Sequence, residues 1–379
     1  MARNIPTHPV RQGYEGNVPE NIFAVPCILI KTFMRTHQQH IVVTGGAGYI
    51  GSVLVPRLLE ENYKVTVFDT LYFGKRSMRA FKDNIRLIQG DVRRPPRQLL
   101  HAVDAVIHLA ALSNDPTAEF NPEANAEINT EGTKIIAEMA RKQGVKRFIL
   151  ASSCSIYDLG LEAEIALKNE TSRVCPRNPY SKSKYFAEQA LLRLANATFS
   201  PIILRKGTVY GYSPRMRYDL IVNTMVRDAI RTKKLHIFCH GKQWRPLVSI
   251  EDVAEAYVQS LKKSRTDLHG KVINIASDNY RVEDVAKEVQ KVFLDAFHEH
   301  IDLVYENANK PDRSYCVSTK RAKQLLGFKP NHSIASSVYE LAKNILERPS
   351  LQRFENPLFY NIERMKPILQ HMPSFLGQP

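Results

Sequence analysis

No apolar stretch of the 379-residue chain approaches the roughly 18–20 residues that a membrane-spanning helix needs. The longest run near the N-terminus, at 22–30, is short and is interrupted by Pro26. It also follows a leader that contains Glu15 and Glu20, which a signal peptide would not carry. We therefore expect neither a secretory signal nor association with a membrane.

Cysteine is scarce, and its spacing lacks the patterns of a disulfide framework or a zinc site. The five cysteines are odd in number, scattered, and without a CxxC pair, at positions 27, 154, 175, 239 and 316. This usage is typical of a reducing compartment, and we expect a cytoplasmic protein with no bound metal.

The chain also lacks a basic tail and any nucleic-acid-binding motif, although its formal net charge is +15. The excess of positive charge is concentrated at 205–245, a segment that contains ten lysines and arginines but only two aspartates. A compact basic patch suits a small diphosphate ligand as well as it suits a polynucleotide. The motifs described below favour the small ligand, and we expect no nucleic-acid partner.

Short apolar runs that alternate with helical patterns dominate the chain from residue 40 onward. Strands are expected at 40–45, 64–69, 85–91, 105–111, 147–153 and 201–207. These runs are apolar nearly throughout, and amphipathic segments such as 123–143 separate them, which indicates a parallel sheet covered on both faces. The predicted fold is α/β, a doubly wound parallel sheet of the Rossmann type.

The alternation loosens after about residue 207, where the spacing predicts helices at 216–232, 251–262, 282–298 and 334–347. We interpret 39–206 as the nucleotide-binding domain and 207–347 as a smaller, partly interleaved α/β region that binds the substrate. The aperiodic ends, 1–38 and 348–379, are expected to be loosely attached.

A glycine fingerprint at 42–52 lies where one is informative, after a strand and before a helix. Gly45, Gly48 and Gly51 suit a tight turn, a close approach to a pyrophosphate, and contact between helix and strand. Asp69 ends the next strand, where a carboxylate accepts hydrogen bonds from ribose hydroxyls and repels a 2′-phosphate. The pattern favours NAD over NADP, although basic residues nearby and a purely structural glycine turn leave alternatives open.

The segment 178–190 holds Tyr180 and Lys184 one helical turn apart, so both side chains share a face. An ammonium close to a phenol favours the phenolate and lowers its pKa, which makes the tyrosine a usable acid or base. Alone, such a pair is also typical of a solvated helix face.

Together these features resemble the extended short-chain dehydrogenase/reductase family, in its nucleotide-sugar epimerase and dehydratase branch. The resemblance runs from about 40 to 347. It depends on an ordered series of motifs: TGGAGYIGS, Asp69, GDV, HLAA, NTEGT, SSCSIY, YSKSK, LRKGTVYG and RPLVSIEDVA.

The resemblance implies three catalytic residues. Ser153 hydrogen-bonds the substrate oxygen, Tyr180 is the acid and base, and Lys184 orients the tyrosine and holds the nicotinamide ribose. It also implies an NAD site, whose residues would be Gly45, Gly48, Tyr49, Ile50, Gly51, Asp69, Asp91, Val92, Leu109, Ala110, Ala111, Asn129, Tyr180 and Lys184.

For the substrate, the resemblance implies that Asn223 and Arg245 contact the diphosphate, with Arg313 as a further candidate. Arg215 and Arg217 add positive charge from the loop 213–219. A purely structural role for Asn223, Arg245 or Arg313 remains an alternative. Relatives commonly form homodimers, which we expect here by analogy alone.

Two departures affect the expected reaction. Thr208 and Ser113 replace residues of the galactose-epimerase pattern, so the sugar is not implied. Cys154 and Ser155 stand where relatives that eliminate water or decarboxylate place acids. We therefore predict an NAD-dependent epimerase of a nucleotide-diphosphate sugar. The alternatives are a dehydratase, a 4-keto-sugar oxidoreductase, or an RNA-binding protein on the same fold.

Overall fold

The computed structural model describes residues 38–157, 166–306 and 313–375. The expected N-terminal extension, 1–38, lies outside these ranges except for Gln38. None of the described helices is both long and apolar enough to cross a bilayer.

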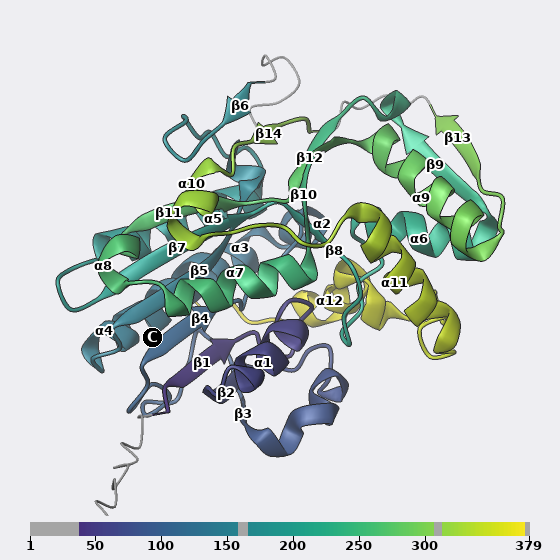
Figure 1. Ribbon diagram of the computed structural model, residues 1–379. Helices are drawn as coiled ribbons and strands as arrows, with labels where there is room; N and C mark the ends of the chain where they lie inside the picture. The colour runs from purple at the N-terminus through teal and green to yellow at the C-terminus, as the bar shows by residue number, and fades with distance from the viewer. Residues whose placement is uncertain (1–37, 158–165, 307–312, 376–379) are drawn as a thin grey trace, which may run out of the picture. The chain divides into compact units, whose positions relative to one another are not determined.

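A seven-stranded sheet forms the centre of the fold (Figure 1). All its neighbouring strands run parallel, in the order β3-β2-β1-β4-β5-β7-β11. The strands are β1 (His40–Thr44), β2 (Lys64–Asp69), β3 (Ile85–Gln89), β4 (Ala105–His108), β5 (Arg147–Ser153), β7 (Ser200–Lys206) and β11 (Lys271–Ile275). The order reverses beside β1, as in the predicted doubly wound fold, which is confirmed.

Helices cover both faces of this sheet because its strands are apolar on both sides. In β1, Ile41 and Val43 pack into one core and Val42 packs into the other. The first core includes residues of α1 (Gly51–Glu60), α7 (Ile250–Lys262), α8 (Arg265–Leu268) and α10 (Lys320–Leu326). The second includes residues of α3 (Pro122–Ala126), α4 (Gly132–Lys142), α5 (Pro179–Arg193) and α12 (Asn361–Gln370).

Two predicted helices differ in detail from the structure. The segment expected at 123–143 is divided into α3, a wider turn at Glu127–Glu131, and α4. The helix expected at 216–232 begins only at Ile221, as α6 (Ile221–Thr232). The preceding residues form a loop because their charged side chains turn toward a cavity, where Arg217 pairs with Asp219.

The second region forms a smaller core around α6, α9 (Val282–Phe297) and α11 (Ile334–Glu347). Its strands are β8 (Thr208–Tyr210), β10 (Trp244–Ser249) and β12 (Asp278–Arg281) in one sheet, and β9 (Lys234–Phe238) with β13 (Asp302–Glu306) in another. A further pair joins β6 (Leu167–Lys168) and β14 (Cys316–Val317). Because β11 returns to the large sheet, the two regions are interleaved.

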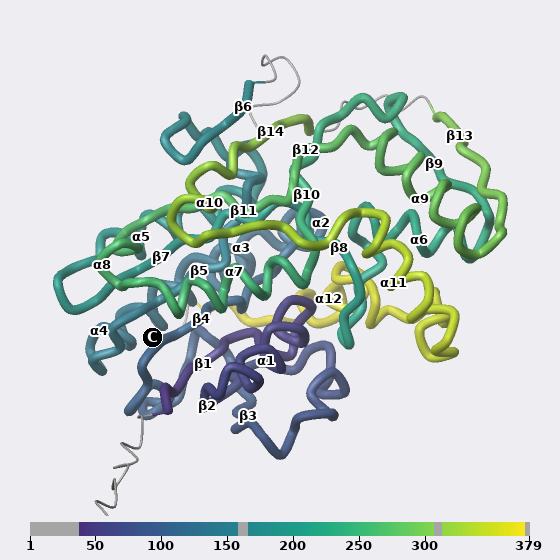
Figure 2. The backbone as a smooth tube through the Cα atoms, in the orientation of Figure 1, coloured from purple at the N-terminus to yellow at the C-terminus, as the bar shows by residue number. Residues whose placement is uncertain are grey.

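The C-terminal segment differs from the loose attachment expected for 348–379. Its helix α12 contacts α2 (Asp115–Phe120), and Figure 2 shows it, in yellow, among much earlier parts of the chain. Met365 and Leu369 are each only 2% exposed and belong to the core of the large sheet. The expectation is corrected for this helix, whose apolar side chains are spaced one turn apart and fill a gap in the fold.

Candidate active site

A cavity of about 670 Å³ opens where the parallel strands end. Residues that follow or end β1, β2, β3, β4, β5 and β7 line its wall, as expected for a ligand site in a doubly wound fold. Residues of the second region and of α12 complete the wall.

The glycine loop connects β1 to α1 along one side of the cavity. Gly45 has a φ of +71°, and a Cβ there would lie 2.6 Å from the backbone nitrogen of Ala110. A Cβ on Gly51 would collide with the backbone of Gly46. Glycine is therefore required at both positions, and the loop brings the N-terminus of α1 to the cavity, where its N–H groups suit a phosphate.

Nearly all the predicted cofactor residues line this cavity. They are Gly45, Gly48, Tyr49, Ile50, Gly51, Asp69, Asp91, Val92, Leu109, Ala110, Ala111, Tyr180 and Lys184. The Asp69 carboxylate accepts backbone hydrogen bonds from Ala47 (3.0 Å) and Leu71 (2.7 Å), which fix it at the end of β2. Its burial raises the pKa of this carboxyl group, whereas the two hydrogen bonds lower it.

Two predicted ligand-binding residues instead hold the protein together. Asn129 is 1% exposed, and its amide bonds both backbone groups of Leu112 and the Ser183 hydroxyl. Asn223 is fully buried; it accepts from the Gly211 backbone and donates to the Tyr49 hydroxyl. Neither residue lines the cavity, and these internal hydrogen bonds favour the structural role that the sequence left open for Asn223.

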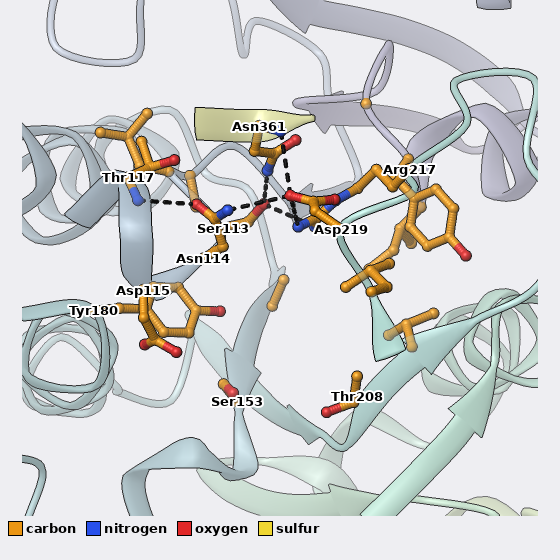
Figure 3. A pocket seen from close by; sticks show the side chains of 18 of the residues that line it. Ser113, Asn114, Asp115, Thr117, Ser153, Tyr180, Thr208, Arg217, Asp219 and Asn361 are labelled. Atoms are coloured by element: carbon orange, nitrogen blue, oxygen red, sulfur yellow. Dashed lines mark hydrogen bonds and ion pairs between the residues drawn. The ribbon is translucent and has the colours of Figure 1, made fainter. Parts of the chain in front are cut away.

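The three predicted catalytic residues lie together on the cavity wall. Ser153 ends β5, and Tyr180 lies in the first turn of α5, which Asn178 caps by accepting from Ser181. Lys184 follows one turn later and donates to the Ala151 carbonyl at 3.0 Å. Figure 3 shows Tyr180 and Ser153 facing the same space.

The pKa of Tyr180 differs from the sequence-based expectation. Burial raises it to about 12, and the charge of Asp115 adds to this effect, whereas Ser153, Arg217 and Arg313 lower it. Burial lowers the pKa of Lys184 to about 8. The low phenol pKa expected from the pairing with Lys184 is therefore not found, because desolvation is the largest influence on Tyr180 and Lys184 is not among the main charges that lower its pKa.

The thiol after Ser153 lies outside the cavity wall. Cys154 is fully buried, and its Sγ donates to the Arg205 carbonyl oxygen at 3.1 Å. Burial raises the pKa of this thiol well above its usual value. Ser155 lines the cavity, and its backbone N–H bonds the Ser153 hydroxyl oxygen at 3.1 Å. No acid therefore directly follows Ser153 at the site, as the sequence indicates.

Arginines line the part of the cavity that the second region contributes. Arg245 is 9% exposed, and Arg313 forms an ion pair with Asp115. Arg215 stacks on Phe73 at 3.6 Å and is 7% exposed. Its Nε and Nη1 atoms are buried without a hydrogen-bond partner among the described residues. Unpartnered donors of this kind fit an anionic ligand.

Sequence reasoning missed three residues of the cavity. Asn361, in α12, accepts from Arg215 at 2.6 Å and donates to Ser113 at 3.0 Å. Lys206 donates to the Ser152 carbonyl at 2.8 Å. Asp115 lies beside Tyr180 (Figure 3). A lysine at the end of a strand that is fully buried and has an apolar centre is a signal for Lys206, but no local pattern marks the other two.

The sequence model of the NAD dependent epimerase/dehydratase family matches residues 41–276. The chain belongs to this family. The predicted recognition is confirmed, and so is NAD as the cofactor, because members of the family depend on it. The glycine loop and the unpartnered donors of Arg215 fit the phosphates of such a cofactor.

Known relatives differ in their reactions. The chain is 27% identical over 310 residues to a UDP-N-acetyl-alpha-D-glucosaminuronate decarboxylase of Bacillus cytotoxicus, covering 78% of this chain and 94% of the relative. It is 29% identical over 300 residues to a trifunctional UDP-glucose 4,6-dehydratase/3,5-epimerase/reductase of Arabidopsis thaliana, covering 76% of this chain and 44% of that protein. The crystal structure of a Thermotoga maritima UDP-glucose 4-epimerase with UDP-glucose matches with a TM-score of 0.71 and 26% identity, over 82% of this chain and 99% of that one.

Proposed function

We propose that the protein is an NAD-dependent epimerase of a UDP-linked sugar. The observation that carries the proposal is the grouping of Ser153, Tyr180 and Lys184 on one wall of a cavity that the glycine loop also lines. We propose UDP as the nucleotide because the relatives named above have UDP-sugars in their names or as crystal ligands.

Each catalytic side chain has a separate task. The Tyr180 phenol oxygen takes the proton of a sugar hydroxyl and later returns it. Ser153 hydrogen-bonds the same sugar oxygen and holds it near the phenol. Lys184 lies one turn after Tyr180 in α5, and its hydrogen bond to the Ala151 carbonyl holds its ammonium group at β5. Bound NAD supplies the acceptor and donor of the hydride.

Epimerisation is favoured over elimination and decarboxylation because the residues after Ser153 carry no acid. Cys154 is fully buried and does not line the cavity, so its thiol does not reach a bound sugar. Arg245 and Arg313 are proposed to bind the substrate diphosphate, because planar guanidinium groups suit that contact.

To test this proposal, the purified full chain is incubated with NAD and a panel of UDP-sugars. The products are then analysed by chromatography and mass spectrometry. We expect an epimer of unchanged mass and no accumulation of reduced cofactor. A product lighter by one water or one carbon dioxide would contradict epimerisation. Binding of RNA with steep salt dependence, together with no effect on any UDP-sugar, would favour the RNA-binding alternative.

We also propose that the protein is a cytoplasmic homodimer. The described cysteines, at 154, 175, 239 and 316, are all free thiols, which supports a reducing compartment. Light scattering of the purified protein tests the dimer, and fractionation of the source cells tests the location. The proposal of a dimer fails if the scattering mass equals that of one chain.

A further inference from the structure

The carboxylate of Asp115 lies on the cavity wall beside the Tyr180 phenol (Figure 3). Asp115 is the first residue of the short helix α2, which packs against α5, the helix that carries Tyr180. Asn114 caps α2 by accepting from the Thr117 backbone at 3.3 Å. The position of the carboxylate is therefore fixed by two packed elements.

The two oxygens of this carboxylate have different surroundings. Oδ2 forms an ion pair with Arg313, whose side chain reaches it from the second region. Oδ1 is buried and has no hydrogen-bond partner among the described residues. A buried carboxylate oxygen without a donor is costly, so a donor from a ligand is expected at this point.

Several charged or polar groups face Tyr180 from the elements around it. Ser153 comes from β5, Arg217 from the loop before α6, and Arg313 from the segment before β14. Asp115 is the acid among the groups that influence the phenol, and its charge raises the phenol pKa. The carboxylate is therefore close to the atom proposed to exchange a proton with the sugar.

We infer that Asp115 contacts the sugar ring of the substrate and restricts the enzyme to sugars without a ring carboxylate. Oδ1 would accept a hydrogen bond from a sugar hydroxyl, whereas a hexuronic acid would bring a second negative charge to the same place. Arg313, the cation that a sugar carboxylate would need, is already paired with Asp115. This inference depends on the proposed function and narrows its substrate class to neutral hexoses.

The test compares UDP-glucose and UDP-glucuronic acid as probes, with NAD-loaded wild type, Asp115→Asn and Glu119→Gln. Glu119 is an exposed acid of the same helix and serves as the matched control. We expect wild type to bind UDP-glucose about tenfold more tightly than UDP-glucuronic acid, or more. Asp115→Asn should remove most of this difference, and Glu119→Gln should preserve it.

A pH profile provides a second readout, because a purely structural role would not move it. Loss of the Asp115 charge lowers the pKa of Tyr180, so the rising limb of kcat/KM should shift to lower pH in Asp115→Asn. The inference is overturned if wild type binds UDP-glucuronic acid as tightly as UDP-glucose, or if Asp115→Asn preserves the preference. If wild type binds neither probe, the proposed function fails instead.

Discussion

Lys184 and Lys206 donate hydrogen bonds to successive carbonyl oxygens of β5, those of Ala151 at 3.0 Å and Ser152 at 2.8 Å. Both lysines are buried, with 4% and 9% of the residue surface exposed. Burial lowers the pKa of Lys184 to about 8 and that of Lys206 to about 7, and the charge of Lys184 lowers the latter further. Two buried lysines therefore lie at the same end of β5, where the positive charge of one disfavours that of the other.

Replacement of Lys206 by Met should flatten the dependence of stability on pH. Between about pH 7 and 10, the unfolded chain keeps a proton that folded Lys206 has lost, so the free energy of unfolding rises with pH. The rise is at most about 1.4 kcal/mol per pH unit for one lysine. Urea unfolding of the cofactor-free protein at several pH values measures this rise in the free energy of unfolding.

Lys206→Met should be more stable than wild type near pH 7. The control, Lys234→Met, removes an exposed lysine and should leave the pH dependence of stability unchanged. If the free energy of unfolding rises equally with pH in all three proteins, the argument is contradicted.

Tyr180→Phe tests the proposed acid and base directly. The variant should lose turnover by about two to four orders of magnitude, because proton transfer alone is removed. NAD affinity, measured by calorimetry, should stay close to that of wild type. Tyr185→Phe removes a hydroxyl from the next turn position of α5 and should keep its activity. Near-normal turnover of Tyr180→Phe would assign the proton transfer to another group.

The features that the sequence predicts well are local. The glycine loop needs Gly45 because a Cβ there would meet the backbone of Leu109 and Ala110, which follow β4, and one short motif carries that glycine. The apolar strands and the pair Tyr180 and Lys184 depend on spacing alone. These patterns predict six of the seven strands of the sheet, all except β11, and most of the cavity-lining residues that we propose to bind the cofactor.

The features that the sequence does not predict depend on distant parts of the chain. Asp115 becomes important because α2 packs against α5, and Asn361 because α12 packs against α2. The raised pKa of Tyr180 depends on its burial in the folded chain, which no local motif shows. The internal hydrogen bonds of Asn223 are likewise not predicted, because a motif gives a residue's position but not the direction in which its amide points.

The C-terminal helix should contribute strongly to stability. Leu369→Ala removes a side chain that is 2% exposed in the core of the large sheet, which should cost about 2–4 kcal/mol of unfolding free energy. Glu363→Ala, on the polar side of the same helix, should cost much less. Chemical unfolding measures both variants. Equal stability of the two would restore the expectation of a loosely attached tail, and a chain ending at residue 347 would then fold normally.

Arg215 should bind the phosphates of NAD. Its Nε and Nη1 atoms are buried without partners among the described residues, and the neighbouring charge of Asp69 places it on the cofactor side of the cavity. Hydrogen bonds to charged groups contribute about 1.5–3 kcal/mol, so Arg215→Met should weaken NAD binding about ten- to a hundredfold. Calorimetric titration with NAD measures the change, with exposed Arg231→Met as the control.

The stability of the cofactor-free protein separates this role from a structural one. Burial and the charge of Arg217 lower the pKa of Arg215 to about 9. The charged guanidinium therefore destabilises the folded protein until an anion binds beside it. Arg215→Met should therefore unfold at the same or a higher temperature than wild type without NAD, yet gain less stability when NAD is added. A variant that loses stability without NAD and keeps its NAD affinity would make Arg215 a structural residue. Weaker binding of the UDP-sugar alone would assign its unpartnered donors to the substrate diphosphate.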